Sequence, residues 1–363
     1  MPEPDSARLP YKPDYAVPPG ETLQETLEAL GMTQAQLAVR TGLTPKTINQ
    51  IVKGGHALSL ETAIKLERAT GVPAHVWNAL EMSYRERLAR VADRQSLEAD
   101  LDWLEGIPTG ELIKRGVIQP AKNKVELLDS VLAFFGVSGS AEWENLWIER
   151  LAASFRKSSH VPMEPGPTAT WLRLGELRAM KIECQPYDMD RFVEALRRLR
   201  AQTVEPPEVF QDNLTDWCAA AGVAVALIPE LRGCPAYGVT RWLAPTKGMI
   251  QLSLRYKSDD QFWFSFFHEA WHVLHGAKRD MAVHYGADED EEDERANRFA
   301  ADVLIPAEHA GVLPLLRSKA AVAQFATRIG IAPGIVVGRL QREGLVRYKD
   351  MNGLKRRFVW KSG

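Results

Sequence analysis

The chain has 363 residues, of which 45% are hydrophobic and 25% charged, and its formal net charge is −2. This length allows two or three domains with cores of their own, whereas the near-zero net charge excludes a uniformly basic surface, so any nucleic-acid contact needs a local patch. The three cysteines are far apart and form no CxxC pair, and no run of about eighteen apolar residues occurs, so we expect a cytoplasmic protein with reduced cysteines and no membrane span.

The N-terminal quarter of the chain predicts an arm followed by short helices. Residues 1–19 are rich in proline and polar groups, without the apolar core of a signal peptide, and predict an irregular arm. Residues 20–90 contain segments with apolar residues three or four apart, each followed by a stop signal; they are ETLQETLEALG, TQAQLAVRTG, TPKTINQIVKGG, SLETAIKLERATG and AHVWNALEMSYRERLAR. Thr33, Thr44 and Ser59 are the expected N-caps. The pattern predicts a five-helix domain over residues 20–90.

Two of these helices, in TQAQLAVRTGLTPKTINQIVKGG, predict a unit that reads DNA. They meet at Gly42, where glycine permits a sharp turn, and the second begins at Thr44 with Pro45 in the first helical position. Gln34 opens the first helix, where a helix N-terminus and a side-chain amide can together hold a phosphate. The outward face of the second helix is polar and neutral to basic, which suits base edges in a major groove; it carries Lys46, Thr47, Asn49, Gln50 and Lys53. The alternative is a generic helical bundle whose exposed faces are merely polar.

The pattern Q-x-x-L-A-x-x-x-G-x-x-x-x-x-I-x-x-x-x-x-G, from Gln34 to Gly54, resembles the helix-turn-helix domain of the lambda-repressor/Cro (XRE) class. Within that class, PGETLQETLEALGMTQAQLA and SLETAIKLERATGVPAHVWNALE are similar to the HigA/VapI antitoxins. The resemblance implies a lambda-repressor-like fold and a homodimer on double-stranded operator DNA. It further implies a co-encoded toxin, such as a RelE-like ribonuclease, as a partner. The DNA-binding candidates are Gln34, Thr44, Lys46, Thr47, Asn49, Gln50 and Lys53.

Residues 91–204 predict further helices but carry no chemical motif. The clearest amphipathic segments are VELLDSVLAFFGV and DRFVEALRRLRAQ, and the loop SSHVPMEPGPT divides the region in two. We expect a helical linker or dimerisation region here, and the stretch AQTVEPPEVF that follows its last helix predicts a linker.

Residues 205–363 predict a domain in which short strands precede helices. The runs GVAVALIPE, AYGVTRWL and MIQLSLRY are β-branched or aromatic and are bounded by glycine and proline, as strands are. A long apolar helix, an acidic loop GADEDEEDE and the helix ERANRFAADVLIP follow. The tail LVRYKDMNGLKRRFVW predicts a hairpin that turns at Asn352-Gly353. The expected fold class is therefore multidomain, mainly α with a small α+β part.

The apolar helix contains the stretch FWFSFFHEAWHVLHG, which predicts one half of a metal site. His268 and His272 stand four residues apart and so lie on one helix face, where their imidazole nitrogens suit zinc. Glu269 is the expected general base: it takes a proton from the attacking water and passes it to the leaving amine. The alternative is a buried core helix that happens to contain histidines.

A zinc site needs a third ligand, and a carboxylate is the strongest candidate. The metzincin subclass requires a histidine where this chain has Lys278, so that subclass is excluded. Histidines placed like His275 and His284 are more often ordinary loop residues than metal ligands. In the helix after the acidic loop, the apolar stripe extrapolated backwards puts Glu292 and Asp293 on the inward side. An acid at the helix N-terminus is also favourable in its own right, which is the alternative role for Asp293.

The string HEAWHVLH followed by D-x-x-A-N-R-F-A-A-D-V-L-I-P resembles the ImmA/IrrE family of metallopeptidases. The resemblance implies a thermolysin-like (zincin) fold around Zn²⁺. In that family the third ligand is usually a glutamate three residues before the first alanine of A-N-x-F-A, and here that position is Asp293, one methylene shorter. The implied metal ligands are therefore His268, His272 and Asp293, with Glu269 as the catalytic residue.

Two functions from different classes stay open. The first is a DNA-binding regulator of the HigA antitoxin type, which represses its own operon, neutralises a toxin and carries a metallopeptidase-like domain as sensor or toxin-binding surface. The second is an active zinc endopeptidase that cleaves a repressor or another regulatory protein. The helix-turn-helix pattern favours the first, and the intact H-E-x-x-H motif keeps the second open.

Overall fold

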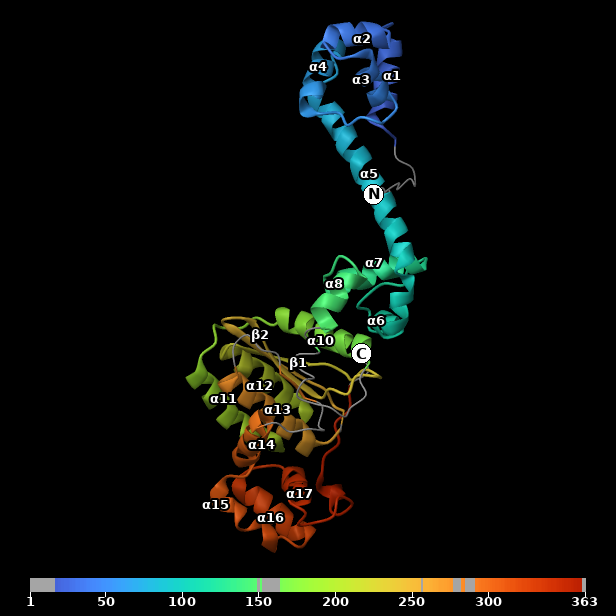
Figure 1. Ribbon diagram of the computed structural model, residues 1–363. Helices are drawn as coiled ribbons and strands as arrows, with labels where there is room; N and C mark the ends of the chain where they lie inside the picture. Colours follow the sequence, from blue (N-terminus) through green and yellow to red (C-terminus); the bar gives the residue numbers. More distant parts are fainter. Residues whose placement is uncertain are drawn as a thin grey trace, which may run out of the picture. The chain divides into compact units, whose positions relative to one another are not determined.

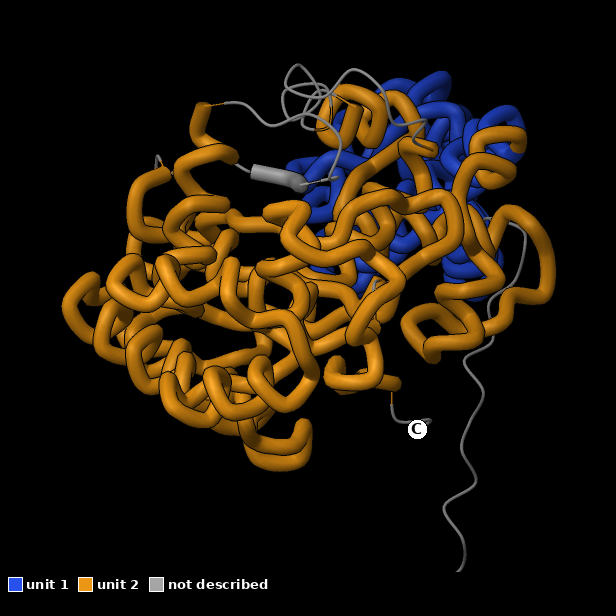
Figure 2. The backbone as a smooth tube through the Cα atoms, turned by 90° about the horizontal axis from the view of Figure 1, so that it is seen from below, with its two compact units in different colours: residues 1–101 blue, residues 102–363 orange. Residues whose placement is uncertain are grey.

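The computed structural model describes residues 17–148, 151, 164–255, 257–276, 282–284 and 291–360. The chain forms two compact units, residues 1–101 and residues 102–363, which Figure 2 shows in separate colours. Most of the predicted N-terminal arm, residues 1–16, lies outside the described residues, as do positions 286–290 of the predicted acidic loop.

The described part of unit 1 consists of helices joined by short turns and loops, as the sequence predicts. Its helices are α1 (Pro19–Ala29), α2 (Gln34–Thr41), α3 (Pro45–Val52), α4 (Leu60–Thr70) and α5 (Ala74–Ala99). The predicted N-caps are confirmed, because the side chains of Thr33, Thr44 and Ser59 each accept a hydrogen bond from a backbone N–H in the first turn. The core is apolar and buried; it includes Leu23, Leu27, Leu37, Ile48, Ile51, Leu66 and Trp77.

A glycine sets the approach of α1 to α3. A Cβ atom built on Gly20 would lie 2.2 Å from the carbonyl oxygen of Val52, so no larger residue fits without moving a helix. The fifth helix continues to Ala99, about two turns beyond the end expected near Arg90. It runs on because the stretch from Ala74 to Ala99 contains neither glycine nor proline to stop it.

The first half of unit 2 is also helical. Its elements are η1 (Leu101–Gly106), α6 (Thr109–Lys114), α7 (Lys124–Phe135), α8 (Ser140–Trp143), η2 (Glu144–Ile148), α10 (Pro165–Met180), α11 (Met189–Ala201), η3 (Gln202–Val204) and α12 (Pro207–Ala220). The two predicted amphipathic helices are α7 and α11. The prediction of a linker over residues 201–210 is wrong: α12 already begins at Pro207, since proline is as favourable at the start of a helix as in a loop.

A four-stranded sheet forms the centre of unit 2, with strand order β1-β3-β2-β4. The strands are β1 (Val223–Leu227), β2 (Gly238–Ala244), β3 (Lys247–Leu252) and β4 (Ala282–His284). β1 runs parallel to β3, whereas β2 is antiparallel to both β3 and β4. The first three strands were predicted and β4 was not. Helix α10 covers one face of the sheet, and α12 and α13 (Asp259–His275) cover the other (Figure 1).

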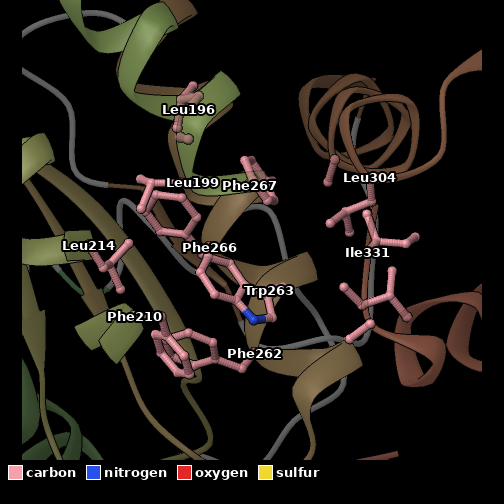
Figure 3. Close-up of a cluster of buried hydrophobic side chains, with 14 of the residues drawn as sticks. Leu196, Leu199, Phe210, Leu214, Phe262, Trp263, Phe266, Phe267, Leu304 and Ile331 are labelled. Carbon is pink, nitrogen blue, oxygen red and sulfur yellow. The ribbon is translucent and has the colours of Figure 1, made fainter. Parts of the chain in front are cut away.

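The core of unit 2 explains why α13 is buried on nearly all sides. Four aromatic side chains from two successive turns of α13 pack among side chains from α11, α12 and α14 (Figure 3). They are Phe262, Trp263, Phe266 and Phe267. Burying one such side chain contributes about 1.5–3 kcal/mol. The helix that carries the predicted histidines is therefore fixed rigidly against the sheet.

The C-terminal part of unit 2 continues with helices and ends in a turn. Its elements are α14 (Glu291–Leu304), α15 (Ala307–Ala310), η4 (Leu313–Leu315), α16 (Lys319–Ile329), α17 (Pro333–Arg342) and η5 (Asn352–Leu354). Among the described residues no single helix is long and apolar enough to cross a membrane; only the bent pair α16 and α17, taken together at 114°, reaches that length and composition.

The predicted hairpin at Asn352-Gly353 is wrong. These residues form the 3₁₀ turn η5, and the segment after them bridges Ser258 through Arg357 instead of pairing with its own preceding strand. The physical reason is the buried side-chain amide of Gln341, which donates hydrogen bonds to the carbonyl oxygens of Tyr348 and Asp350. This amide holds the loop in a compact form that a two-stranded ladder would break.

Candidate metal centre and nucleic-acid interface

Helix α13 presents two histidine nitrogens to one point. His268 and His272 are 3% and 5% exposed, and their Nε2 atoms are 3.4 Å apart. The two rings converge because a four-residue step returns to nearly the same face of the helix. The aromatic packing of α13 leaves this face turned towards α14, which lies beside it (Figure 1).

Helix α14 brings a carboxylate to the same point. Asp293, in the first turn of α14, places Oδ1 at 3.8 Å from Nε2 of His268 and 3.6 Å from Nε2 of His272. The three donor atoms lie within 4.8 Å of one another. Two donors that are each about 2.0–2.1 Å from a tetrahedral ion are roughly 3.4 Å apart. Both the donor types and their separations therefore fit zinc.

The hydrogen bond behind His268 also fits a metal ligand. Nδ1 of His268 lies 2.9 Å from Oδ1 of Asn297 on α14. An amide oxygen only accepts hydrogen bonds, so Nδ1 carries the proton and Nε2 presents a lone pair towards His272 and Asp293. Sequence reasoning missed Asn297, although it stands four residues after Asp293 and hence on the same face of α14.

Glu269 lies beside the histidines and is fixed to strand β2. Its side chain is fully buried, and Oε2 accepts a hydrogen bond from the hydroxyl of Thr240 at 2.7 Å. A Cβ atom on Gly238 would lie 2.2 Å from Oε1 of Glu269, so the glycine leaves the room that this carboxylate occupies. Sequence reasoning identified Glu269 but neither Thr240 nor Gly238, which precede it by 29 or more positions.

The other predicted positions lie apart from this cluster or outside the described side chains. Nδ1 of His275 lies 3.1 Å from the carbonyl oxygen of Trp271, and the imidazole ring stacks on the indole ring of the same residue. The backbone of His284 belongs to β4 and pairs with Gly238, but its side chain is outside the described residues, as is Lys278. The prediction that Glu292 lies on the inward side is wrong, because Glu292 is exposed, whereas its neighbour Asp293 is half-buried.

Helix α3 presents the predicted DNA-reading residues. Ile48 and Ile51 anchor α3 in the core of unit 1. The opposite side of the helix is open to solvent; its exposed residues include Lys46, Asn49, Gln50 and Lys53. The Thr44 and Thr47 hydroxyls bond to each other at 2.8 Å, and the Thr44 oxygen accepts the Thr47 N–H. These two threonines thus order the first turn of the helix.

Gln34 is the first residue of α2 and is half-buried. Its side-chain amide donates to Oε1 of Gln24 on α1 at 3.1 Å, which orients it at the helix N-terminus. In this position the amide and the backbone N–H groups of α2 lie together, an arrangement that suits a phosphate oxygen.

Comparison with known proteins gives two family matches within the chain. Residues 23–77 match a helix-turn-helix family, and residues 236–341 match the IrrE N-terminal-like domain. The chain is 32% identical over 83 residues to Virulence-associated protein I of Dichelobacter nodosus, which covers 23% of this chain and 76% of that protein. It is 37% identical over 54 residues to Gene 30 protein of Enterobacteria phage phi80, which covers 15% of this chain and 74% of that protein.

Proposed function

Since the chain belongs to the helix-turn-helix family and joins that domain to an IrrE N-terminal-like domain, we propose that it is a DNA-binding regulator whose second domain holds zinc. The single observation that carries the zinc assignment is the convergence of one carboxylate and two imidazole donors from α13 and α14. The DNA assignment rests on the exposed polar side of α3, which is anchored from behind by its isoleucines.

Operator binding is tested with the protein's own promoter. The wild-type protein is expected to shift a palindromic promoter fragment, and Gln50→Ala to weaken that shift about ten-fold or more, because a bidentate base contact contributes about 1–3 kcal/mol of discrimination. Gln95→Ala is the matched control, since Gln95 is exposed on α5 rather than α3. Equal binding by Gln50→Ala, or equal affinity for unrelated DNA, would contradict the proposal.

The residues proposed to hold zinc are His268, His272 and Asp293. When bound there, zinc supplies a Lewis acid that polarises a carbonyl group. Asn297 orients the ring of His268, so that Nε2 and not Nδ1 faces the ion. The dry setting of α13 strengthens these electrostatic interactions, because few water dipoles screen them.

A second candidate function is proteolysis, and the position of Glu269 favours it. Glu269 directly follows His268 in α13 and its carboxylate is held by Thr240, a placement that suits a base that takes a proton from water and returns it to a leaving amine. We expect new N-terminal peptides of regulatory proteins in cells that express the wild type, and none with Glu269→Gln, which keeps the metal ligands. Identical peptide sets from both would argue against Glu269 as the base.

The antitoxin role remains part of this proposal. The partner is a co-encoded toxin and the DNA-binding form is a homodimer, both implied by the HigA/VapI-like segments of α1–α5; the helix-turn-helix match supports the DNA-binding part alone. Co-expression with the product of the adjacent gene is expected to give a stable complex and to relieve its toxicity. Light scattering that reports only monomers on operator DNA would contradict the dimer.

A further inference from the structure

A cavity of about 380 Å³ lies in unit 2 between α13, α14 and α17. Its apolar lining includes Phe264 and Ala301, and three arginines also line it; they are Arg298, Arg339 and Arg342. We call this cavity the arginine pocket. Its volume falls within the range of roughly 300–1,000 Å³ that small-molecule sites occupy.

The arginine pocket carries an excess of positive charge. Its two carboxylates already have cationic partners: Asp260 pairs with Lys355 at 2.6 Å, and Glu343 pairs with Arg339 at 2.5 Å. Within the described part of the chain, no ion pair involves Arg298 on α14. Because three arginines line the pocket and each of its two carboxylates has a cationic partner, the pocket favours an anionic ligand.

One guanidinium nitrogen of the pocket lacks a hydrogen-bond acceptor. Nη1 of Arg339 is buried and has no hydrogen-bond partner among the described residues. A buried donor without an acceptor is unfavourable. A bound carboxylate would supply the acceptor, since its oxygens accept charge-assisted hydrogen bonds from guanidinium groups.

We propose that the arginine pocket binds an apolar carboxylate: a single carboxylate group on a short, aromatic or aliphatic body. The carboxylate contacts the arginines and the body packs on Phe264 and Ala301. The same chemistry is offered by a free organic acid or by the C-terminal end of a peptide with an apolar last residue. The pocket also includes Asn297, which orients His268, but binding of the ligand requires no metal.

The test is calorimetric titration of the full chain with two pairs of probes. 4-Phenylbutyrate represents the free acid, and acetyl-Ala-Phe with a free carboxylate represents the peptide end; their carboxamides are neutral probes of nearly the same shape. We expect at least one acid to bind, and its amide to bind about ten-fold more weakly or worse, since the charge-assisted hydrogen bonds are lost. The acid that binds identifies the source of the ligand.

Three variants locate the bound acid. Arg298→Gln is expected to weaken binding about ten-fold, and Ala301→Phe to abolish it by filling the cavity. Arg295→Gln makes the same charge change at an exposed position of α14 that does not line the pocket, and should bind as the wild type does. Melting curves verify that each variant is folded; Arg298 is exposed, so its replacement leaves the core intact.

The proposal is overturned if acid and amide bind equally, if neither acid binds, or if folded Arg298→Gln binds as tightly as the wild type. Titration of His272→Ala distinguishes binding of the acid in the arginine pocket from binding at the metal centre. Retained binding in that variant supports the arginine pocket. Binding that is lost in His272→Ala but retained in Arg298→Gln would assign the acid to the metal and overturn the proposal.

Discussion

The hydroxyl of Thr240 lies 2.7 Å from Oε2 of Glu269 and 2.9 Å from the backbone oxygen of the same residue. Both side chains are buried. The orientation of the proposed base therefore depends on the register of β2 against β3, because that register decides whether Thr240 faces α13 or the opposite layer.

Thr240→Val is expected to lower the free energy of unfolding by about 1–3 kcal/mol, since it keeps the shape but leaves a buried carboxylate oxygen without this donor. Urea unfolding measures the change. Thr240→Ser is the control, because serine keeps the hydroxyl. A loss in Thr240→Ser together with no loss in Thr240→Val would mean that the methyl group, and not the hydrogen bond, matters.

Asn297→Ala is expected to weaken zinc binding by about 10–100-fold, as the loss of an outer partner of a histidine ligand does. Asn297→Asp keeps an acceptor for the Nδ1–H of His268 and should retain most of the affinity. Competition with a chelator of known affinity reports both values. An unchanged affinity in Asn297→Ala would remove the orienting role proposed for this side chain.

Asp259 makes the stability of unit 2 dependent on pH. The pKa of Asp259 is raised from 3.8 to about 6; burial is the largest cause and the neighbouring Asp260 adds to it, while backbone hydrogen bonds and the charge of Arg356 oppose the shift. The folded state therefore binds this proton more tightly than the unfolded state, and its stability falls as pH rises from about 4 to about 6.

Asp259→Asn removes the buried charge and should raise the free energy of unfolding at pH 7.5 by on the order of 1–3 kcal/mol. The gain should vanish below about pH 4, where the wild-type group is protonated in both states. Urea titrations at several pH values measure it. Asp129→Asn, on the exposed side of α7, should show no such trend; a constant gain at all pH values would contradict the assignment to Asp259.

Gly20→Ala should destabilise unit 1 by about 1–3 kcal/mol, because the added methyl group overlaps the carbonyl oxygen of Val52. Gly110→Ala is the matched control: Gly110 also lies in a helix, but nothing is within 4 Å of its missing Cβ. Thermal melting compares them. Gly110 lies in unit 2, so its variant reports the effect of a Gly→Ala change without a clash, and the prediction fails if Gly20→Ala leaves the melting temperature of unit 1 unchanged.

Unit 1 could be predicted well because its signals are local. The capping threonines and the glycines with positive φ, such as Gly42 at 70°, are specified within one or two turns of the helices they end. Strands β1 to β3 were equally readable from their β-branched runs. β4 was missed because three residues carry no pattern, and its partner β2 lies about forty positions earlier.

The candidate metal centre was predictable where its spacing is helical. The step from His268 to His272 and the inward side of α14 both follow from the helical period. Thr240 was not predictable, because a strand and a helix that meet in space leave no shared pattern in the sequence. The tail was predicted wrongly for a similar reason: Gln341, on a preceding helix, decides the loop geometry.

The most direct test of the zinc assignment is the metal content of the purified, folded protein, measured by mass spectrometry on the wild type and three variants. The account predicts about one zinc per chain in the wild type and in His275→Ala, because His275 lies apart from the donor cluster. It predicts that His272→Ala and Asp293→Ala lose the metal. A wild type without zinc, or equal zinc in all four proteins, would contradict it.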